Sequence, residues 1–181
     1  MHAGSFVLSV LWFMQWEGLE DAAAGAFTTP CHSARLGFPI SMFIGEYRHT
    51  FDAKNRISLP AKFRKELGTS VIVTRGLDKC LFIYPKSAWK KQAEEIAKHS
   101  TGGAAGRGLA RLMLAGASEA DVDSAGRILV PDYLRSFAAV KDKAVIAGVS
   151  NRVELWDEEA WAAYTASIEK EADNFAEKLA A

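Results

Sequence analysis

The sequence predicts an α+β protein, rich in β-strands, that is built from two copies of one small unit. The first copy contains DAKNRISLPAKFR at residues 52–64, and the second contains DSAGRILVPDYLR at 123–135. An Asp, two Arg, an Ile and a Pro coincide between them, and Trp89 is matched further on by Trp161. Because these matches occur in order, we infer an internal repeat, which fixes the architecture before any other feature.

Short strands and a short helix are expected at the start of the first unit, which we place at residues 42–100. A strand ends near Thr50, and a second short strand covers 56–59 after a turn. Proline is typical of the start of a helix and glycine of its end, so a short helix lies between Pro60 and Gly68.

A hairpin and a longer helix complete this unit. Two runs of β-branched and aromatic residues, 70–74 and 81–84, flank a turn-like Gly-Leu-Asp-Lys segment and predict the hairpin. Apolar residues then recur at helical spacing over 85–99, which predicts an amphipathic helix. Trp89 on this helix, like its counterpart Trp161, is expected to pack in the core or at an oligomer interface.

Residues 101–116 are expected to join the two units. The glycine-rich part, 101–108, predicts a flexible linker, and a short helix follows at 109–114. The second unit, 117–181, is expected to repeat the strands and the short helix and to end in a long helix at 158–179.

Residues 1–41 differ from the rest of the chain. They contain an apolar run and an alanine stretch but no sustained helical or strand periodicity. A different pattern begins at Met42, so we expect an N-terminal extension that is disordered or results from a misassigned start.

The charges are balanced in total but unevenly distributed. Lys and Arg number 22 and Asp and Glu number 22, so the net charge is zero. Residues 42–79 nevertheless hold eight basic against four acidic residues, whereas 119–157 hold five against seven. Since phosphate binding needs clustered Lys and Arg, the first copy is the candidate nucleic-acid surface.

Each copy carries an Asp-xxx-Arg motif whose fourth residue, Asn55 or Gly126, tolerates a positive φ. We expect a tight turn in which the carboxylate of Asp52, or of Asp123, accepts backbone N–H bonds. The following arginine would then project from a rigid turn. Two readings stay open: the Asp and Arg pair only to fix the turn, or the Arg also contacts a ligand.

Lysine and arginine at such a turn suit double-stranded DNA, where they bind guanine O6 and N7 or phosphate oxygens, and a β-element can enter the major groove. The candidate DNA-contacting residues are Arg56 and Lys54 at the first turn, Lys62, Arg64 and Lys65 on the short helix, and Arg127 at the second turn. For those on the helix, a merely solvated face remains the alternative.

The sequence contains no motif typical of a metal site, a phosphate-binding loop or a membrane span. Cys31 and Cys80 lie far apart without a CxxC or His/Cys cluster, which predicts no metal site and a reducing compartment. The segment 102–108 lacks the Lys-Ser/Thr of a phosphate loop, and the apolar run 6–16 is too short to cross a bilayer. We therefore expect no enzyme, cofactor, small-molecule substrate or membrane partner.

The segment MFIGEYRHTFDAKNRISLP at 42–60, the second Asp-xxx-Arg unit and ELWD at 154–157 together resemble the MraZ family of bacterial regulators over residues 42–181. The resemblance implies two AbrB/SpoVT-like swapped-hairpin units that form a β-barrel flanked by helices, and subunits that assemble into a ring. Asn55 stands where the family usually has glycine.

The function that this resemblance implies is sequence-specific DNA-binding transcriptional regulation, usually repression. The target would be direct repeats upstream of the division and cell-wall gene cluster, bound in the cytoplasm at the nucleoid. Arg56 is the matching DNA contact, with Lys54 and Arg64 as weaker neighbours.

A rival hypothesis is a protein-interaction module of the antitoxin type that uses the same barrel to bind a toxin or a sister chain. Such a module would be marked by a disordered C-terminal tail. The helical pattern at 158–179 disfavours it.

Overall fold

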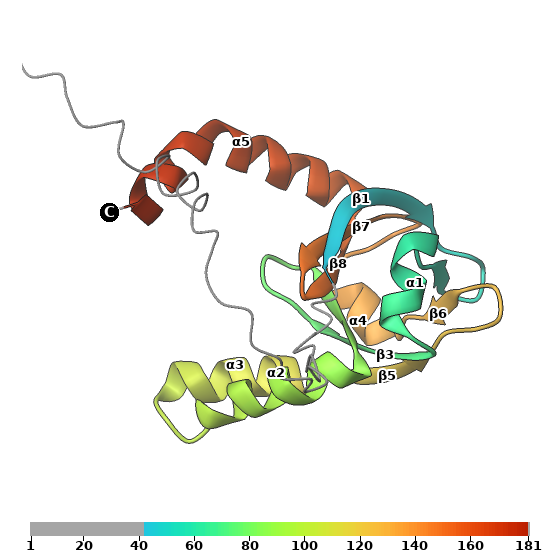
Figure 1. Ribbon diagram of the computed structural model, residues 1–181, viewed down its shortest axis with the longest axis horizontal. Coiled ribbons are helices and arrows are strands. Elements are labelled where there is room, and N and C mark those ends of the chain that lie inside the picture. The colour runs from blue at the N-terminus through green and yellow to red at the C-terminus, as the bar shows by residue number, and fades with distance from the viewer. Residues whose placement is uncertain (1–41, 181) are drawn as a thin grey trace, which may run out of the picture. The chain divides into compact units, whose positions relative to one another are not determined.

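The structure, a computed structural model, describes residues 42–180, and the expected extension at 1–41 lies outside the described residues. The elements, shown in Figure 1, are β1 (Phe43–Thr50), β2 (Arg56–Ser58), α1 (Ala61–Leu67), β3 (Ser70–Arg75), β4 (Leu81–Pro85), α2 (Lys86–Lys98), α3 (Ala104–Leu114), β5 (Ser118–Asp121), β6 (Arg127–Leu129), α4 (Asp132–Phe137), β7 (Lys143–Ser150), β8 (Arg152–Asp157) and α5 (Glu158–Ala180). The α+β class is as the sequence predicts.

The two copies exchange strands. The larger sheet is antiparallel with the order β1-β7-β8-β4-β3-β5, and β2 pairs with β6 in a separate two-stranded ribbon. Thus β1 of the first copy pairs with β7 of the second, and β5 of the second pairs with β3 of the first. Ile57 lies opposite Ile128 in the ribbon, and Phe82 lies opposite Glu154 between β4 and β8, so the copies are related by an approximate two-fold axis.

The expected β-barrel is not closed. Strands β1 and β5 form the two edges of the six-stranded sheet, and no pairing joins them. Strand β5 is only four residues long and pairs on one side with β3. The β2–β6 ribbon covers the open side instead, with Ile57 and Ile128 both fully buried.

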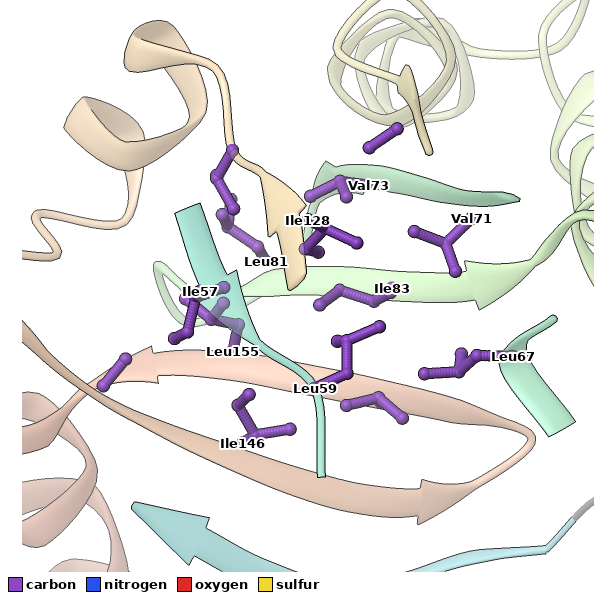
Figure 2. Packing of buried hydrophobic residues seen from close by; sticks show 14 of the residues in the cluster. Ile57, Leu59, Leu67, Val71, Val73, Leu81, Ile83, Ile128, Ile146 and Leu155 are labelled. Carbon is purple, nitrogen blue, oxygen red and sulfur yellow. The ribbon is translucent and has the colours of Figure 1, made fainter. Parts of the chain in front are cut away.

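One face of the sheet, the β2–β6 ribbon and helices α1 and α4 enclose the main core. Figure 2 shows side chains from both copies meeting there, among them Ile57, Leu59, Leu67, Val71, Val73, Leu81, Ile83, Ile128, Ile146 and Leu155. Full burial of such a side chain contributes about 1.5–3 kcal/mol. The ribbon that follows both Asp-xxx turns is therefore held in place by its own side chains, Ile57 and Ile128, which are buried in this core.

A second apolar cluster lies under helices α2, α3 and α5. Trp89 packs on Tyr84 with ring centroids 5.5 Å apart, and Trp161 packs on Trp156 at 5.4 Å. Both tryptophans are partly buried, as expected from their helical spacing.

The linker between the copies is mostly helical. We expected a flexible segment over 101–108, but α3 begins at Ala104. A Cβ atom at Gly106 would collide with the backbone oxygen of His99, the residue after α2. This glycine therefore permits close approach of two helices, which sequence alone did not distinguish from flexibility.

Candidate nucleic-acid interface

The first Asp-xxx-Arg motif forms a tight turn held by one carboxylate. Asp52 Oδ1 accepts hydrogen bonds from the backbone N–H groups of Lys54 and Arg56, both at 2.9 Å. The backbone also closes on itself, because Asp52 N–H donates to the Arg56 oxygen at 2.9 Å. Asn55 takes the left-handed conformation with φ 58°. The turn geometry is as the motif predicts.

The second motif repeats this geometry. Asp123 Oδ1 accepts from the backbone of Ala125 and Arg127, both at 2.9 Å, and Gly126 has φ 75°. In the antiparallel pairing of β2 with β6, Arg56 lies opposite Leu129 and Ser58 lies opposite Arg127, so the two turns enter the ribbon from opposite ends.

Each arginine folds back onto the carboxylate of its own turn. Arg56 donates from Nε to Asp52 Oδ2 at 2.8 Å, and its Nη2 lies 2.7 Å from the same oxygen. Arg127 contacts Asp123 Oδ2 in the same way, at 2.9 Å from both nitrogens. The sequence predicted an arginine projecting from the turn, whereas the guanidinium group is held side-on against it.

The two turns are also coupled across the approximate two-fold axis. Arg56 Nη1 lies 3.7 Å from Asp123 Oδ2, and Arg127 Nη1 lies 3.8 Å from Asp52 Oδ2. All four side chains are about one-third exposed, at 30–33 %. We call these four residues, Asp52, Arg56, Asp123 and Arg127, the Asp–Arg quartet. Because Nε and Nη2 face the aspartate, the Nη1 end of each guanidinium remains for weaker or alternative contacts.

Arginines from the two short helices support the opposite turns. Arg135 of α4 donates to Asn55 Oδ1, while Asn55 Nδ2 donates to Asp132 Oδ1 at 2.7 Å. Asparagine at this position is thus used as a hydrogen-bonding residue. In the other turn, a Cβ at Gly126 would collide with the guanidinium of Arg64, so glycine there makes room for it.

Arg64 is less available than the sequence suggested. Its Nε donates to the Leu59 backbone oxygen at 2.8 Å while the guanidinium covers Gly126. Arg135, the equivalent residue in the second copy, was not among the sequence candidates. The internal repeat could have identified Arg135, because this residue aligns with Arg64 in the two motifs.

The exposed basic residues of this surface come from the first copy, with Lys54 in the first turn and Lys62 and Lys65 on α1, whose Arg64 covers Gly126 of the second turn. Lys54, Lys62 and Lys65 are exposed and have no salt-bridge partner among residues 42–180. The equivalent positions of the second copy are occupied by the uncharged residues Ala125, Tyr133 and Ser136. The quartet has two positive and two negative charges, so the local positive potential comes from these lysines.

Hydrogen bonds lower the pKa values of both aspartates. Those donated by the Arg56 side chain and backbone lower the pKa of Asp52 from 3.8 to about 2. Backbone and side-chain hydrogen bonds from Arg127 lower the pKa of Asp123. Both carboxylates therefore stay ionised well below neutral pH, which keeps the guanidinium groups in place.

We expect the quartet to make stability depend on acid pH. Because the folded pKa of Asp52 lies below its unfolded value of 3.8, its contribution is fully present above pH ~4 and is lost as the pH falls to about 2. Urea midpoints measured between pH 5 and pH 2 should fall less in Asp52→Asn than in the unchanged protein, and Asp123→Asn should act in the same direction. Identical decreases in all three proteins would contradict this role.

Other kinds of site find no support in the described part of the chain. Residues 42–180 contain no group of three His, Cys, Asp or Glu residues placed to hold a metal ion. None of the helices in this range is long and apolar enough to cross a membrane.

Comparison with known proteins identifies the family. A family model described as "MraZ protein, putative antitoxin-like" matches twice, at residues 42–112 and at 113–181. The chain belongs to the MraZ family. The double match agrees with the internal repeat, and it excludes residues 1–41.

Relatives in the MraZ family match along nearly their whole length. The "Transcriptional regulator MraZ" of Natranaerobius thermophilus is 46% identical over 138 residues, which is 76% of this chain and 96% of the relative. The protein of the same name from Carboxydothermus hydrogenoformans is 44% identical with the same coverage, and that of Roseiflexus sp. is 41% identical over 77% of this chain and 97% of its own. These names describe regulators, not enzymes.

Proposed function

We propose that this protein is a DNA-binding transcriptional regulator that reads promoter DNA with the β2–β6 ribbon and the turn preceding β2. The main support for this proposal is the Asp–Arg quartet, which fixes the two turns of a two-stranded ribbon. Exposed lysines of the first copy lie on the same part of the chain and form no salt bridge with residues 42–180. A ribbon of this size fits the major groove of B-DNA, which is about 12 Å wide. The names of the MraZ relatives support regulation as the role.

Each basic residue has a defined part in this proposal. Arg56 presents its Nη1 end to a base edge while Asp52 holds the other side of the guanidinium, which suits guanine O6 and N7. Lys54 and Lys62 contact phosphates, because both side chains are exposed and neither forms a salt bridge with another residue of 42–180. Arg127 contributes less, because its own turn carries Ala125 where the first turn carries Lys54, and Arg64 acts mainly by fixing the Gly126 turn.

The target and the assembly follow from the family resemblance. We propose that the protein represses transcription from direct repeats upstream of the division and cell-wall gene cluster, in the cytoplasm at the nucleoid. A ring of subunits would present several turns to successive repeats, and each additional contact becomes intramolecular once the first has formed.

The alternative hypothesis, a protein-interaction module of the antitoxin type, is supported by the words "antitoxin-like" in the family description. Its expected mark, a C-terminal tail without structure, is contradicted because α5 runs from Glu158 to Ala180. The regulator is therefore the function that we put to the test.

Removal of the flanking lysines should weaken DNA binding through phosphate contacts. In the double variant Lys54→Ala/Lys62→Ala we expect weaker binding to all duplexes alike, and a slope of log K against log salt that is smaller by about 1 for each lysine in contact. Fluorescence anisotropy with the gene's own upstream DNA and with an unrelated duplex measures both effects.

The control is Lys91→Ala, which removes an exposed lysine from helix α2, away from the ribbon (Figure 1). It should leave the affinity and the salt slope unchanged. If the double variant and the control gave the same slope as the unchanged protein, the turn of the first copy would not be the DNA surface.

A further inference from the structure

The β2–β6 ribbon presents one large apolar side chain to solvent. Alternate residues along its two strands and just beyond them are fully buried, namely Ile57, Leu59, Ile128 and Val130. Because successive side chains of a strand point to opposite faces, the other residues of the ribbon point away from the core. These are Arg56, Ser58, Arg127 and Leu129. Leu129 is 55 % exposed, so more than half of this apolar residue is in contact with water.

Leu129 is the cross-strand neighbour of Arg56. The register of the ribbon pairs Arg56 with Leu129, and it pairs Ser58 with Arg127. Directly opposed residues of an antiparallel pair point to the same face, with Cβ atoms about 4.5–5.5 Å apart. Successive base pairs of B-DNA are about 3.4 Å apart along the helix axis. Two side chains with this separation therefore reach neighbouring base pairs.

The internal repeat shows that the fold does not require a large apolar residue at this position. Leu129 aligns with Ser58 in the same alignment that matches Arg127 with Arg56. The serine is half-buried and occupies the equivalent outward position of β2. An exposed leucine also adds little to stability, because apolar surface stabilises the fold only when it is removed from water. The side chain of Leu129 is therefore available to a ligand.

The ligand group that fits this side chain in the major groove is the methyl group of thymine. Bases present hydrogen-bond donors and acceptors in this groove, and thymine adds an apolar C5-methyl group. Leucine has no hydrogen-bonding group in its side chain, so it cannot read a donor or an acceptor. Apolar side chains recognise thymine through contact with this methyl group, whereas arginine binds guanine O6 and N7.

We propose that Leu129 contacts the methyl group of a thymine next to the guanine bound by Arg56, and that it sets the specificity for this thymine. The inference rests on the proposed function and adds a base-reading residue from the second copy. One end of the ribbon then reads two neighbouring base pairs with strands of different copies, β2 and β6. At the other end, Ser58 beside Arg127 provides no apolar contact, so this end has no preference for the methyl group.

The test replaces thymine with uracil, which has the same hydrogen-bonding groups but lacks the methyl group. Each thymine of the gene's own upstream duplex is exchanged in turn for deoxyuridine, and affinity is measured by fluorescence anisotropy. At the contacted thymine we expect the affinity of the unchanged protein to fall about fourfold, the effect of removing one methyl group from an apolar contact. Leu129→Ser should bind the thymine duplex at least fourfold more weakly, and deoxyuridine at that position should cause no further loss.

Two variants serve as matched controls. Leu77→Ser makes the same exchange at a leucine that is 53 % exposed in the turn between β3 and β4, outside the ribbon. It should retain both the affinity and the response to deoxyuridine. Ser58→Leu places the apolar side chain beside Arg127 and should make binding sensitive to deoxyuridine at a further position. Urea unfolding and analytical ultracentrifugation check that the variants fold and assemble like the unchanged protein.

Four outcomes would overturn the proposal. In the first, no deoxyuridine lowers the affinity of the unchanged protein, and in the second the loss is as large in Leu129→Ser. In the third, Leu129→Ser binds like the unchanged protein. In the fourth, Leu129→Ser changes the assembly, which would assign this leucine to a contact between copies.

The regulator proposal is separable from this inference. It stands in all four cases when the unchanged protein binds its upstream DNA and the double lysine variant lowers the salt slope. A protein that does not bind this DNA would overturn both proposals.

Discussion

Replacing Phe63 with alanine is expected to lower the free energy of unfolding by about 3–5 kcal/mol. The ring of Phe63 is 2 % exposed and lies edge-on between Phe43 and Tyr47, with centroid distances of 5.4 and 5.2 Å. Its removal leaves a cavity between α1 and β1, and both aromatic contacts are lost. Urea unfolding followed by tryptophan fluorescence measures the change.

Phe63→Leu is the matched control, because it retains most of the volume and should cost about 1.5 kcal/mol or less. Equal losses for leucine and alanine would mean that the cavity does not set the cost. Phe63 also lies on the helix that carries Lys62 and Arg64, so the alanine variant should bind DNA more weakly even under conditions where it remains folded.

Replacing Arg56 with alanine is expected to weaken binding to the gene's own upstream DNA by about 1–3 kcal/mol per engaged subunit, or roughly tenfold for each 1.4 kcal/mol. The loss includes the base contact proposed for Nη1, and it leaves Asp52 facing the DNA without its partner. In an oligomer that binds several repeats, the free-energy losses of the subunits add and the fold-changes in affinity multiply. Binding should be measured by anisotropy at two salt concentrations.

Arg127→Ala is the control that the repeat provides. It removes the same side-on contact from the second turn, so it should destabilise the fold to the same extent as Arg56→Ala. DNA binding should suffer less, because the second turn carries Ala125 where the first carries the exposed Lys54. If both variants lost the same affinity, the two turns would contribute equally; if neither lost any, the quartet would be purely structural.

Arg56→Lys distinguishes charge from geometry. Lysine preserves the positive charge but cannot contact the Asp52 carboxylate and a base edge at the same time. We expect its binding to the specific duplex to approach that of alanine, while its binding to unrelated DNA stays closer to that of the unchanged protein.

Much of the local structure could be predicted from the sequence. Helix α1 lies between Pro60 and Gly68 as expected, and α2 differs from the predicted 85–99 by one residue at each end. The turn conformation was predictable because Asp52 bonds to backbone groups no more than four residues away. Interactions over so few residues depend only on the local sequence, so the sequence alone can predict them.

The candidate site was predicted less completely. The sequence indicated both turns and offered the pairing of Asp52 with Arg56, which the structure shows, but it did not show the approach of Asp123 to Arg56. It also did not show that Arg135 supports Asn55, a contact between residues 80 positions apart. Such partners meet only after the strands have been exchanged.

The two copies of one unit, the two Asp-xxx-Arg turns and the basic first copy can all be inferred from the amino-acid sequence, because repeats, turn residues and charges are local properties. The open sheet, the ribbon that covers it and the joining of the two turns into one quartet depend on contacts between residues that are distant in the chain. Pairing between distant strands depends on strand length and on which apolar faces fit together. A two-residue or 3.6-residue periodicity carries no information about that choice.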